Sequence, residues 1–274
     1  MMDKSEWQTS AGDTWAAEWR RTDRSFIAVT DKLIERTRSF NFSQLLDIGC
    51  GAGELSLALG RGRPEVRVLG VDVSPALVTA ARSRAVNLAN VDFDLHDAAT
   101  WAPPAGFAPQ LLVSRHGVMF FDDPPAAFAN LARAADAGAN LLFSCFRSPA
   151  ENPFFTDVAR LLPQAPPPPP PGTPGPFAFA DKDRMTSILT AGGWESIAID
   201  PFDFAMVTGA GPDPVEDAVG YFSTIGPAAT AARAMEESDR ERFLDRIRDL
   251  ASRNCREGIV SLPAAGWIVT ARRA

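Results

Sequence analysis

The chain has little cysteine, histidine or tyrosine, and this scarcity excludes several classes of protein. Its 274 residues include 3 Cys, 2 His and 1 Tyr. Cys50, Cys145 and Cys255 lie far apart and form no Cys-x-x-Cys pair, so the sequence indicates neither a disulfide framework nor a zinc site. We therefore expect reduced thiols, a cytoplasmic protein and no bound metal.

Long apolar runs and clusters of positive charge are missing as well. No uninterrupted apolar segment reaches the roughly 20 residues that span a membrane, and polar residues occupy the start of the chain where a signal peptide would be apolar. The formal net charge is -7, and no basic run is interleaved with aromatic residues. We expect a soluble monomer or homodimer without a membrane or nucleic-acid partner.

The most informative segment that the chain does contain is a short apolar strand running into a glycine-rich turn. Residues 45–48 lead into a Gly-x-Gly-x-Gly turn at residues 49–53, and a helical pattern begins at Glu54. Backbone without side chains lets a ligand approach closely. A second apolar run, residues 66–71, ends in Asp72, where a ribose diol could donate to the carboxylate. This pairing predicts a nucleotide-like cofactor.

The residue that follows the turn favours one kind of nucleotide. A dinucleotide fold prefers a small residue at the position that Glu54 occupies, because the pyrophosphate lies beside it. A carboxylate there would repel phosphate, and Asp47 adds a second acid nearby. S-adenosylmethionine carries a sulfonium and an ammonium and no phosphate, so the sequence favours this methyl donor over NAD.

Five strand-like runs alternate with helical patterns in the first half of the chain. Such alternation predicts a parallel sheet covered by helices on both faces. Pro124 and Gly138 suit the start and the stop of the helix before the fifth run. The runs are residues 45–48, 66–71, 91–95, 110–114 and 141–146.

The second half of the chain differs in composition. A proline-rich segment at residues 163–176 predicts an exposed extended loop. After it we expect helices near residues 181–191, 214–222 and 238–254, the last with a Ser238–Glu241 capping box, and strands at residues 195–206 and 266–271. The expected domains are a helical segment at 1–43, a core at 44–206 and 265–274, and a helical cap or dimerisation surface at 207–264.

Together these motifs resemble the class I S-adenosylmethionine-dependent methyltransferases over residues 45–271. The glycine turn, residues 71–74 and residues 96–99 are similar to the first three motifs of that family. Residues 114–124, with Trp7 and residues 12–15, resemble a bacterial small-molecule methyltransferase group. The resemblance implies an α/β fold: a Rossmann-like, seven-stranded, mostly parallel sheet with an antiparallel last strand, helices on both faces, and a helical cap between the last two strands.

The resemblance also implies where S-adenosyl-L-methionine binds. The glycines would face its methionine part, Asp72 would accept from both ribose hydroxyls, and Asp97 would accept from the adenine amino group. Ala98 would donate its backbone N–H, Val73 would pack on the adenine, and the Ser114 carbonyl would accept from the ammonium. Asp47 would act through water or through its field. The expected cofactor residues are Asp47, Gly49, Cys50, Gly51, Gly53, Asp72, Val73, Asp97, Ala98 and Ser114.

The acceptor side is less defined by the sequence. His116 follows the fourth strand, where an imidazole could remove a proton from a hydroxyl or an amine, but the sequence favours packing or substrate shaping over this catalytic role. Members of the similar group manage with phenylalanine there. We expect acceptor contacts from Trp15, Arg115, Met119 and Phe120, with core packing or structural charge as the alternative for each.

The expected reaction is in-line methyl transfer to an oxygen, nitrogen or carbon atom of a small organic acceptor, for which positioning can suffice. The Asn/Asp-Pro-Pro-aromatic motif of enzymes that methylate amino groups of DNA is missing after the fourth strand. Two alternatives remain open. One is a catalytically silent S-adenosylmethionine-binding or scaffold protein. The other is an NAD-dependent reductase, which the lack of a Tyr-x-x-x-Lys pair disfavours.

Overall fold

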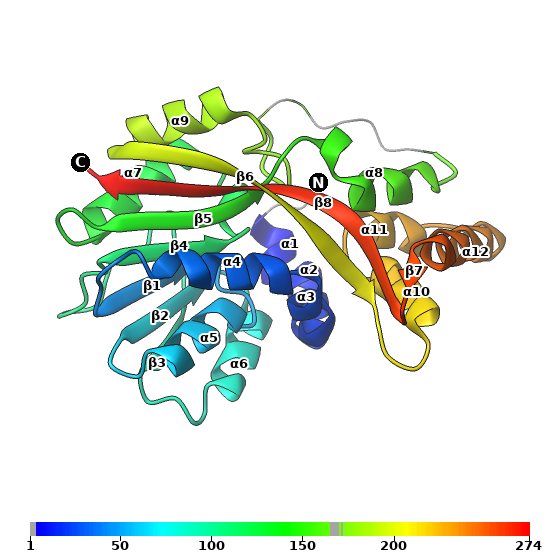
Figure 1. Cartoon of the computed structure of the whole chain (residues 1–274), viewed down its shortest axis with the longest axis horizontal. Helices are drawn as coiled ribbons and strands as arrows, with labels where there is room; N and C mark the ends of the chain where they lie inside the picture. Colours follow the sequence, from blue (N-terminus) through cyan, green and yellow to red (C-terminus); the bar gives the residue numbers. More distant parts are fainter. Residues whose placement is uncertain (1–3, 165–169, 171) are drawn as a thin grey trace.

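The computed structural model describes residues 4–164, 170 and 172–274, in which a central mixed sheet carries helices on both faces (Figure 1). The strands run in the order β3-β2-β1-β4-β5-β8-β6, and short β7 pairs with β8 outside this path. The strands are β1 (Gln44–Ile48), β2 (Arg67–Asp72), β3 (Val91–Leu95), β4 (Leu111–Arg115), β5 (Asn140–Phe146), β6 (Trp194–Gly209), β7 (Cys255–Arg256) and β8 (Ile259–Arg273).

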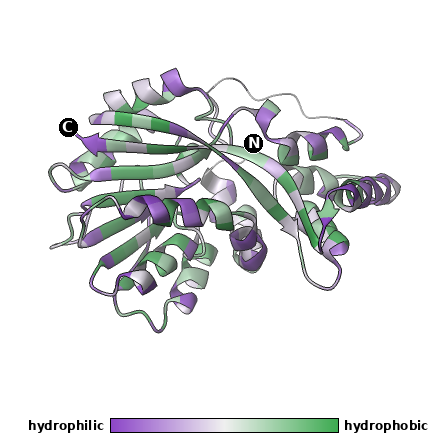
Figure 2. Ribbon diagram, viewed as in Figure 1, coloured by the Kyte–Doolittle hydropathy of each residue, from purple (hydrophilic) through white to green (hydrophobic). Residues whose placement is uncertain are grey.

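The sheet has the predicted topology. β1 to β5 pair in parallel, and β8 lies between β5 and β6, antiparallel to both. The central strands are mainly apolar (Figure 2) and are buried along nearly their whole length because helices cover both of their faces. The seven-stranded, mostly parallel fold with an antiparallel last strand is therefore confirmed.

Helices between the parallel strands begin at residues that cap them. Ser74 and Asp123 accept hydrogen bonds from the first turns of α6 and α7, and a proline follows each of these caps. Asp181 caps α9 in the same way. The helices of the core are α5 (Glu54–Gly62), α6 (Pro75–Arg84), η1 (Val118–Phe120), α7 (Pro124–Ala134), η2 (Pro149–Glu151), α8 (Pro153–Arg160) and α9 (Lys182–Ala191).

The last two long strands extend well beyond the rest of the sheet as a two-stranded ribbon (Figure 1). We expected β6 to end at residue 206 and β8 to begin at residue 266, but their pairing continues to Gly209 and Val260. The extension is stable because Val260 packs with Ala218 and Ala251 of the helices beyond it. These helices are α10 (Pro214–Thr224), α11 (Pro227–Arg233) and α12 (Glu237–Arg253).

The structure corrects the predicted capping box, and part of the proline-rich segment lies outside the residues that it describes. The capping box is wrong: α12 begins after Glu236, so Ser238 lies inside the helix, where its hydroxyl accepts from Arg242 at 3.5 Å. The proline-rich segment includes residues 165–169 and 171, which lie outside the described residues. No helix in the described part of the chain is both long and apolar enough to cross a membrane.

The amino-terminal residues form a chain of short helices beside the carboxyl ends of the strands (Figure 1). Helix α4 packs on the sheet with Val29 and Leu33 fully buried, whereas the three helices before it lie over the site described next. The four are α1 (Lys4–Gln8), α2 (Ser10–Ala17), α3 (Trp19–Ser25) and α4 (Ile27–Thr37).

Candidate functional site

The three glycines of the turn after β1 have different structural roles. All three have positive φ, so a side chain at any of them would be strained. A Cβ atom would meet the Gly117 Cα at 2.8 Å if built on Gly49, and the Phe93 ring at 2.8 Å if built on Gly53. A Cβ on Gly51 would meet nothing within 4 Å. Gly49 and Gly53 are therefore required by packing, and Gly51 alone leaves open space.

Asp72, at the tip of β2, lies directly against this turn. One carboxylate oxygen accepts from the Gly51 amide at 2.8 Å, and the other accepts from the Ser74 amide at 2.9 Å. Burial raises the pKa of Asp72, while the backbone donors oppose the rise. Each oxygen has further lone-pair capacity, so the carboxylate can still accept from a ligand hydroxyl.

A cavity of about 190 Å³ lies at the ends of β2 and β3. Val73 and Leu95 provide apolar walls, and the Leu95 side chain is 45% exposed although it is large and apolar. Asp97 brings a carboxylate to the same cavity, with one oxygen accepting from the Ala99 amide at 2.9 Å. The remaining lining residues are Gln8, Pro75 and His96.

Amino-terminal helices cover this edge of the sheet. Trp7 of α1 makes edge contacts with Trp15 at 5.3 Å and with Phe120 at 5.1 Å between ring centroids. Helix α2 approaches Ser74 so closely that a Cβ on Gly12 would lie 2.2 Å from the Ser74 hydroxyl. Two of the predicted acceptor residues, Trp15 and Phe120, thus lie in one aromatic group beside the Asp72 strand tip.

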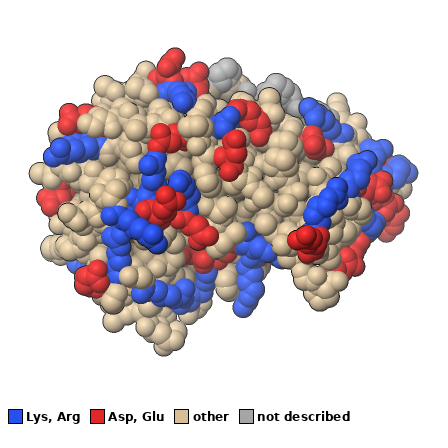
Figure 3. All heavy atoms as spheres, viewed as in Figure 1, with Lys and Arg blue, Asp and Glu red and all other residues tan. Residues whose placement is uncertain are grey.

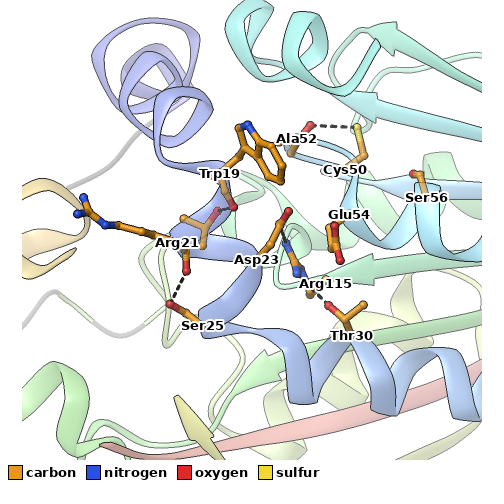
Figure 4. A network of polar contacts seen from close by, with 12 residues as sticks. Trp19, Arg21, Asp23, Ser25, Thr30, Cys50, Ala52, Glu54, Ser56 and Arg115 are labelled. Atoms are coloured by element: carbon orange, nitrogen blue, oxygen red, sulfur yellow. Dashed lines mark hydrogen bonds and ion pairs between the residues drawn. The ribbon is translucent and has the colours of Figure 1, made fainter. Parts of the chain in front are cut away.

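A network of partly buried charges connects α3 with the glycine turn, and Figure 4 shows Asp23, Glu54 and Arg115 of this network. Asp23 accepts from Arg84 at 2.8 Å and from Arg115 at 3.2 Å. Arg84 also binds Glu54 at 2.7 Å and donates to the Ala52 carbonyl within the turn at 2.7 Å. Burial raises the pKa of Glu54, and the neighbouring Asp23 adds to the rise. Arg115 is therefore committed to protein groups, and its predicted contact with an acceptor stays a prediction.

Four of the predicted cofactor residues turn their side chains into the protein. Asp47 is buried and accepts from the Ser56 hydroxyl at 2.6 Å, and burial raises its pKa to about 7. The Ser114 hydroxyl donates to the Ile48 carbonyl at 2.7 Å. The side chains of Cys50 and Ala98 are also buried. Any contact of Ser114 or Ala98 with a ligand would have to involve the backbone, as predicted.

His116 lies beyond the end of β4 in the left-handed region, with φ of 65°. Its Nδ1 is 2.6 Å from the Ser144 hydroxyl, and its Nε2 is buried without a hydrogen-bond partner among the described residues. Burial, and then the nearby Arg115 charge, lower the pKa of His116 to about 3, so the ring is neutral at physiological pH. Met119 is buried in the neighbouring turn, and its carbonyl accepts from Gly175 at 2.9 Å.

Several residues of this region were not predicted from the sequence. No local sequence pattern predicts contacts between segments that are 28 to 92 residues apart. Such contacts involve Asp23, Arg84 and Ser144. Leu95 had a usable signal, because it is an apolar residue at a strand tip directly before His96 and Asp97. Groups of His, Cys, Asp or Glu able to hold a metal do not occur in the residues that the structure describes.

A family model described as a methyltransferase domain matches residues 18–199, which is more than half of the chain. Among curated proteins, the chain is 32% identical over 120 residues to a trans-aconitate 2-methyltransferase of Paracidovorax citrulli, covering 42% of this chain and 45% of that protein. It is 29% identical over 123 residues to a malonyl-[acyl-carrier protein] O-methyltransferase of Hahella chejuensis, covering 42% and 41%. The match spans less than half the length of these relatives.

Solved structures share the fold. One is the YcgJ protein of Bacillus subtilis, with a TM-score of 0.57 and 17% identity over 90% of this chain and 98% of that one. Another is a phosphoethanolamine N-methyltransferase 2 of Haemonchus contortus in complex with S-adenosyl-L-methionine, with a TM-score of 0.59 and 14% identity over 100% of this chain and 61% of that one. At this identity the likeness concerns the fold alone.

Proposed function

Since the chain belongs to the methyltransferase domain family whose model it matches, we propose that it transfers a methyl group from S-adenosyl-L-methionine to an oxygen, nitrogen or carbon atom of a small organic acceptor. One observation carries this proposal. The open Gly51 backbone, the Asp72 carboxylate and the cavity beside Asp97 lie together at neighbouring strand tips. Ligands of open α/β sheets bind at this edge.

The residues present fit the parts of this cofactor. The cavity between Val73 and Leu95 offers apolar walls to a flat adenine, and Asp97 offers an acceptor to its amino group. Asp72 has lone pairs for the ribose hydroxyls. The open space at Gly51 admits the methionine part. Gly49, Cys50 and Gly53 would shape the turn around it by packing against other protein atoms, without touching the ligand themselves.

When bound, the cofactor supplies a methyl group on a sulfonium, which any well-placed nucleophile can attack in line. The contribution of the chain is to orient the reactants and to exclude water. Asp72 and the glycine turn would fix the ribose and the methionine part, while Trp7, Trp15 and Phe120 would cover them. Orientation of this kind can supply about 7–11 kcal/mol of barrier reduction. A strong general base is therefore not required.

The charges beside the turn disfavour the NAD alternative. A pyrophosphate would have to lie against the first turn of α5, where Glu54 and Asp23 present carboxylates and Arg84 is already shared between them. Tyr221 is buried in α10 and belongs to no Tyr-x-x-x-Lys pair. A catalytically silent S-adenosylmethionine-binding or scaffold protein would use the same cofactor site. It would differ from a methyltransferase only in that it transfers no methyl group.

We propose further that the protein acts in the cytoplasm, as a monomer or homodimer, without a nucleic-acid partner. Its cysteines are free thiols, which suits a reducing compartment. On the face seen in Figure 3, basic and acidic side chains are interspersed, as on a surface that does not attract phosphate backbones.

Calorimetric titration with S-adenosylmethionine and with NADH tests the proposal. We expect S-adenosylmethionine to bind and NADH not to bind, and Asp72→Ala to weaken S-adenosylmethionine binding at least about tenfold, since charge-assisted hydrogen bonds are lost. Glu195→Gln, an exposed acid at the start of β6, is the matched control and should bind normally. Preference for NADH, or undiminished binding by Asp72→Ala, would overturn the proposal.

A further inference from the structure

A continuous group of aromatic rings lies beyond the carboxyl ends of β4 and β5. His116 is 4.3 Å from Phe146 and 5.2 Å from Phe26 between ring centroids. Phe155 and Phe177 extend the group, at 5.3 Å and 6.2 Å from Phe146. Phe26, His116 and Phe146 are buried, whereas Phe155 and Phe177 are only partly buried and form its outer rim. We call these five side chains the aromatic cluster.

One polar atom in the aromatic cluster is unusual. The side chain of His116 is more than nine-tenths buried, and its Nε2 has no hydrogen-bond partner in the described part of the chain. Two other atoms of this kind are the Nε atoms of Arg24 and Arg36, whose guanidinium groups bind Asp217 and Asp200 through Nη2. A buried polar atom without a partner costs stability unless a ligand satisfies it.

The backbone conformation of His116 also indicates that a ligand binds its Nε2. His116 has φ of 65°, which is strained for a residue other than glycine, and Ser144 fixes its ring through Nδ1. A histidine that only filled the core would need neither the strain nor an unsatisfied Nε2. The ring is held with Nε2 enclosed among apolar side chains, where a single hydrogen-bonding group of a ligand would satisfy it.

The cations around the aromatic cluster are already paired. Arg115 binds Asp23 and Thr30, and Arg147 binds Glu151 and Asp203. Arg24 binds Asp217. A carboxylate entering this surrounding would lose its hydration and gain no free cation, which is strongly unfavourable. An uncharged polar group bonded to Nε2 meets no such penalty.

Resting on the proposed function, we propose that the acceptor is a phenol, a flat aromatic compound whose uncharged hydroxyl hydrogen-bonds His116 Nε2 while its ring packs against the partly buried outer rim of the aromatic cluster. Edge-to-face and offset contacts between rings favour such a ligand. In the transfer, the hydroxyl oxygen forms a bond to the methyl carbon as the bond from that carbon to sulfur breaks. The electron pair stays on sulfur. The hydroxyl oxygen becomes strongly acidic as the new bond forms, so Nε2 takes its proton, and the resulting imidazolium releases that proton to solvent when the product leaves.

Three probes of nearly equal shape test the inference: p-cresol, toluene and p-toluate. Binding to the full chain saturated with S-adenosylhomocysteine is measured by ligand-observed NMR. We expect p-cresol to bind about tenfold more tightly than toluene, because only p-cresol satisfies Nε2. We expect p-toluate to bind more weakly than both, because its charge finds no partner.

Substitutions of His116 test whether this residue causes the tighter binding of p-cresol than of toluene. His116→Phe should bind p-cresol and toluene equally, and His116→Gln, which retains a polar end, should recover part of the preference. A p-toluate affinity above that of p-cresol, or a His116→Phe protein that keeps the tenfold preference, would overturn the inference. If His116→Phe fails to fold, the comparison of the three probes on the unsubstituted chain decides the matter.

The cofactor measurement separates this inference from the proposed function. Absence of S-adenosylhomocysteine binding would contradict the proposed function and, with it, the acceptor that rests on it. Normal S-adenosylhomocysteine binding together with preference for p-toluate would contradict the phenol alone.

Discussion

At the scale of single residues, the glycines of the turn after β1 meet two requirements, which are close packing against other protein atoms and open space for a ligand. Gly49 and Gly53 are needed because other protein atoms lie where their side chains would be. A side chain on Gly51 would meet open space, so apart from its left-handed φ this glycine is needed only if a ligand fills that space. The sequence predicts the turn and its ligand, but it does not tell the three glycines apart, because that depends on Gly117 and Phe93 from distant segments.

Alanine substitutions should separate the two requirements. Gly51→Ala should cost only about 1 kcal/mol of stability, from its left-handed φ, and should weaken S-adenosylmethionine binding about tenfold or more. Gly53→Ala should lose more stability, about 2–3 kcal/mol, because its Cβ would clash with Phe93 and Ala81. Urea unfolding and calorimetry measure the two effects. Equal loss of S-adenosylmethionine affinity in both variants, at equal stability, would contradict the assignment.

The buried carboxyl of Asp47 should make the free energy of unfolding depend on pH. Burial raises its pKa from 3.8 to about 7, so the folded state favours the protonated carboxyl. Its contribution to stability is complete below about pH 4 and is lost as the pH rises to about 7, amounting to at most about 4 kcal/mol at 1.36 kcal/mol per pKa unit. Asp47→Asn should remove this part of the pH dependence of urea unfolding. An unchanged profile would show that Asp47 is charged in the folded state.

At the scale of elements, α3 joins three parts of the molecule. Its Asp23 binds Arg84 and Arg115 beside the glycine turn, whereas Arg21 and Arg24 bind Asp217 of α10 at 3.0 Å and 2.7 Å. Arg84 in turn holds the Ala52 carbonyl. The position of α3 is therefore coupled to the shape of the turn through Asp23 and to helix α10 through Arg21 and Arg24.

Two matched substitutions test the role of α3. Asp23→Asn removes the carboxylate that the partly buried Arg84 and Arg115 share. It should cost about 1–3 kcal/mol of stability and weaken S-adenosylmethionine binding, because Arg84, left with Glu54 and the Ala52 carbonyl, would hold the turn less firmly. Asp217→Asn should loosen α10 and leave cofactor affinity nearly unchanged. Thermal melts and calorimetry measure both. Equal cofactor affinities in the two variants would show that the α3 network does not shape the turn.

The elements differ in how far sequence predicts them. The parallel strands are predicted within one residue of their observed bounds, because their apolar runs are bounded by clear turn residues. The β6–β8 ribbon is predicted too short, because its outer residues alternate and are buried by helices outside the ribbon, including α3, α10 and α12. Such burial depends on tertiary packing, which periodicity alone does not reveal.

At the scale of the whole molecule, the carboxyl edge of the sheet, the amino-terminal helices and the aromatic cluster surround one region. The sequence places Asp72 and Asp97 at neighbouring strand tips, and the structure has them there, because strand tips of a parallel sheet converge by topology; their contact with a cofactor stays a prediction. The aromatic cluster is not predicted from the sequence, since Phe26, Phe146, Phe155 and Phe177 come together from four segments without a shared motif.

A crystal structure of the protein with S-adenosylhomocysteine tests the central claim most directly. We predict the adenine in the cavity lined by Val73, Leu95 and Asp97, and both ribose hydroxyls within about 3.2 Å of the Asp72 carboxylate. The homocysteine part should pass over Gly51. Product bound at another edge of the sheet, or a ribose that makes no contact with Asp72, would contradict the account.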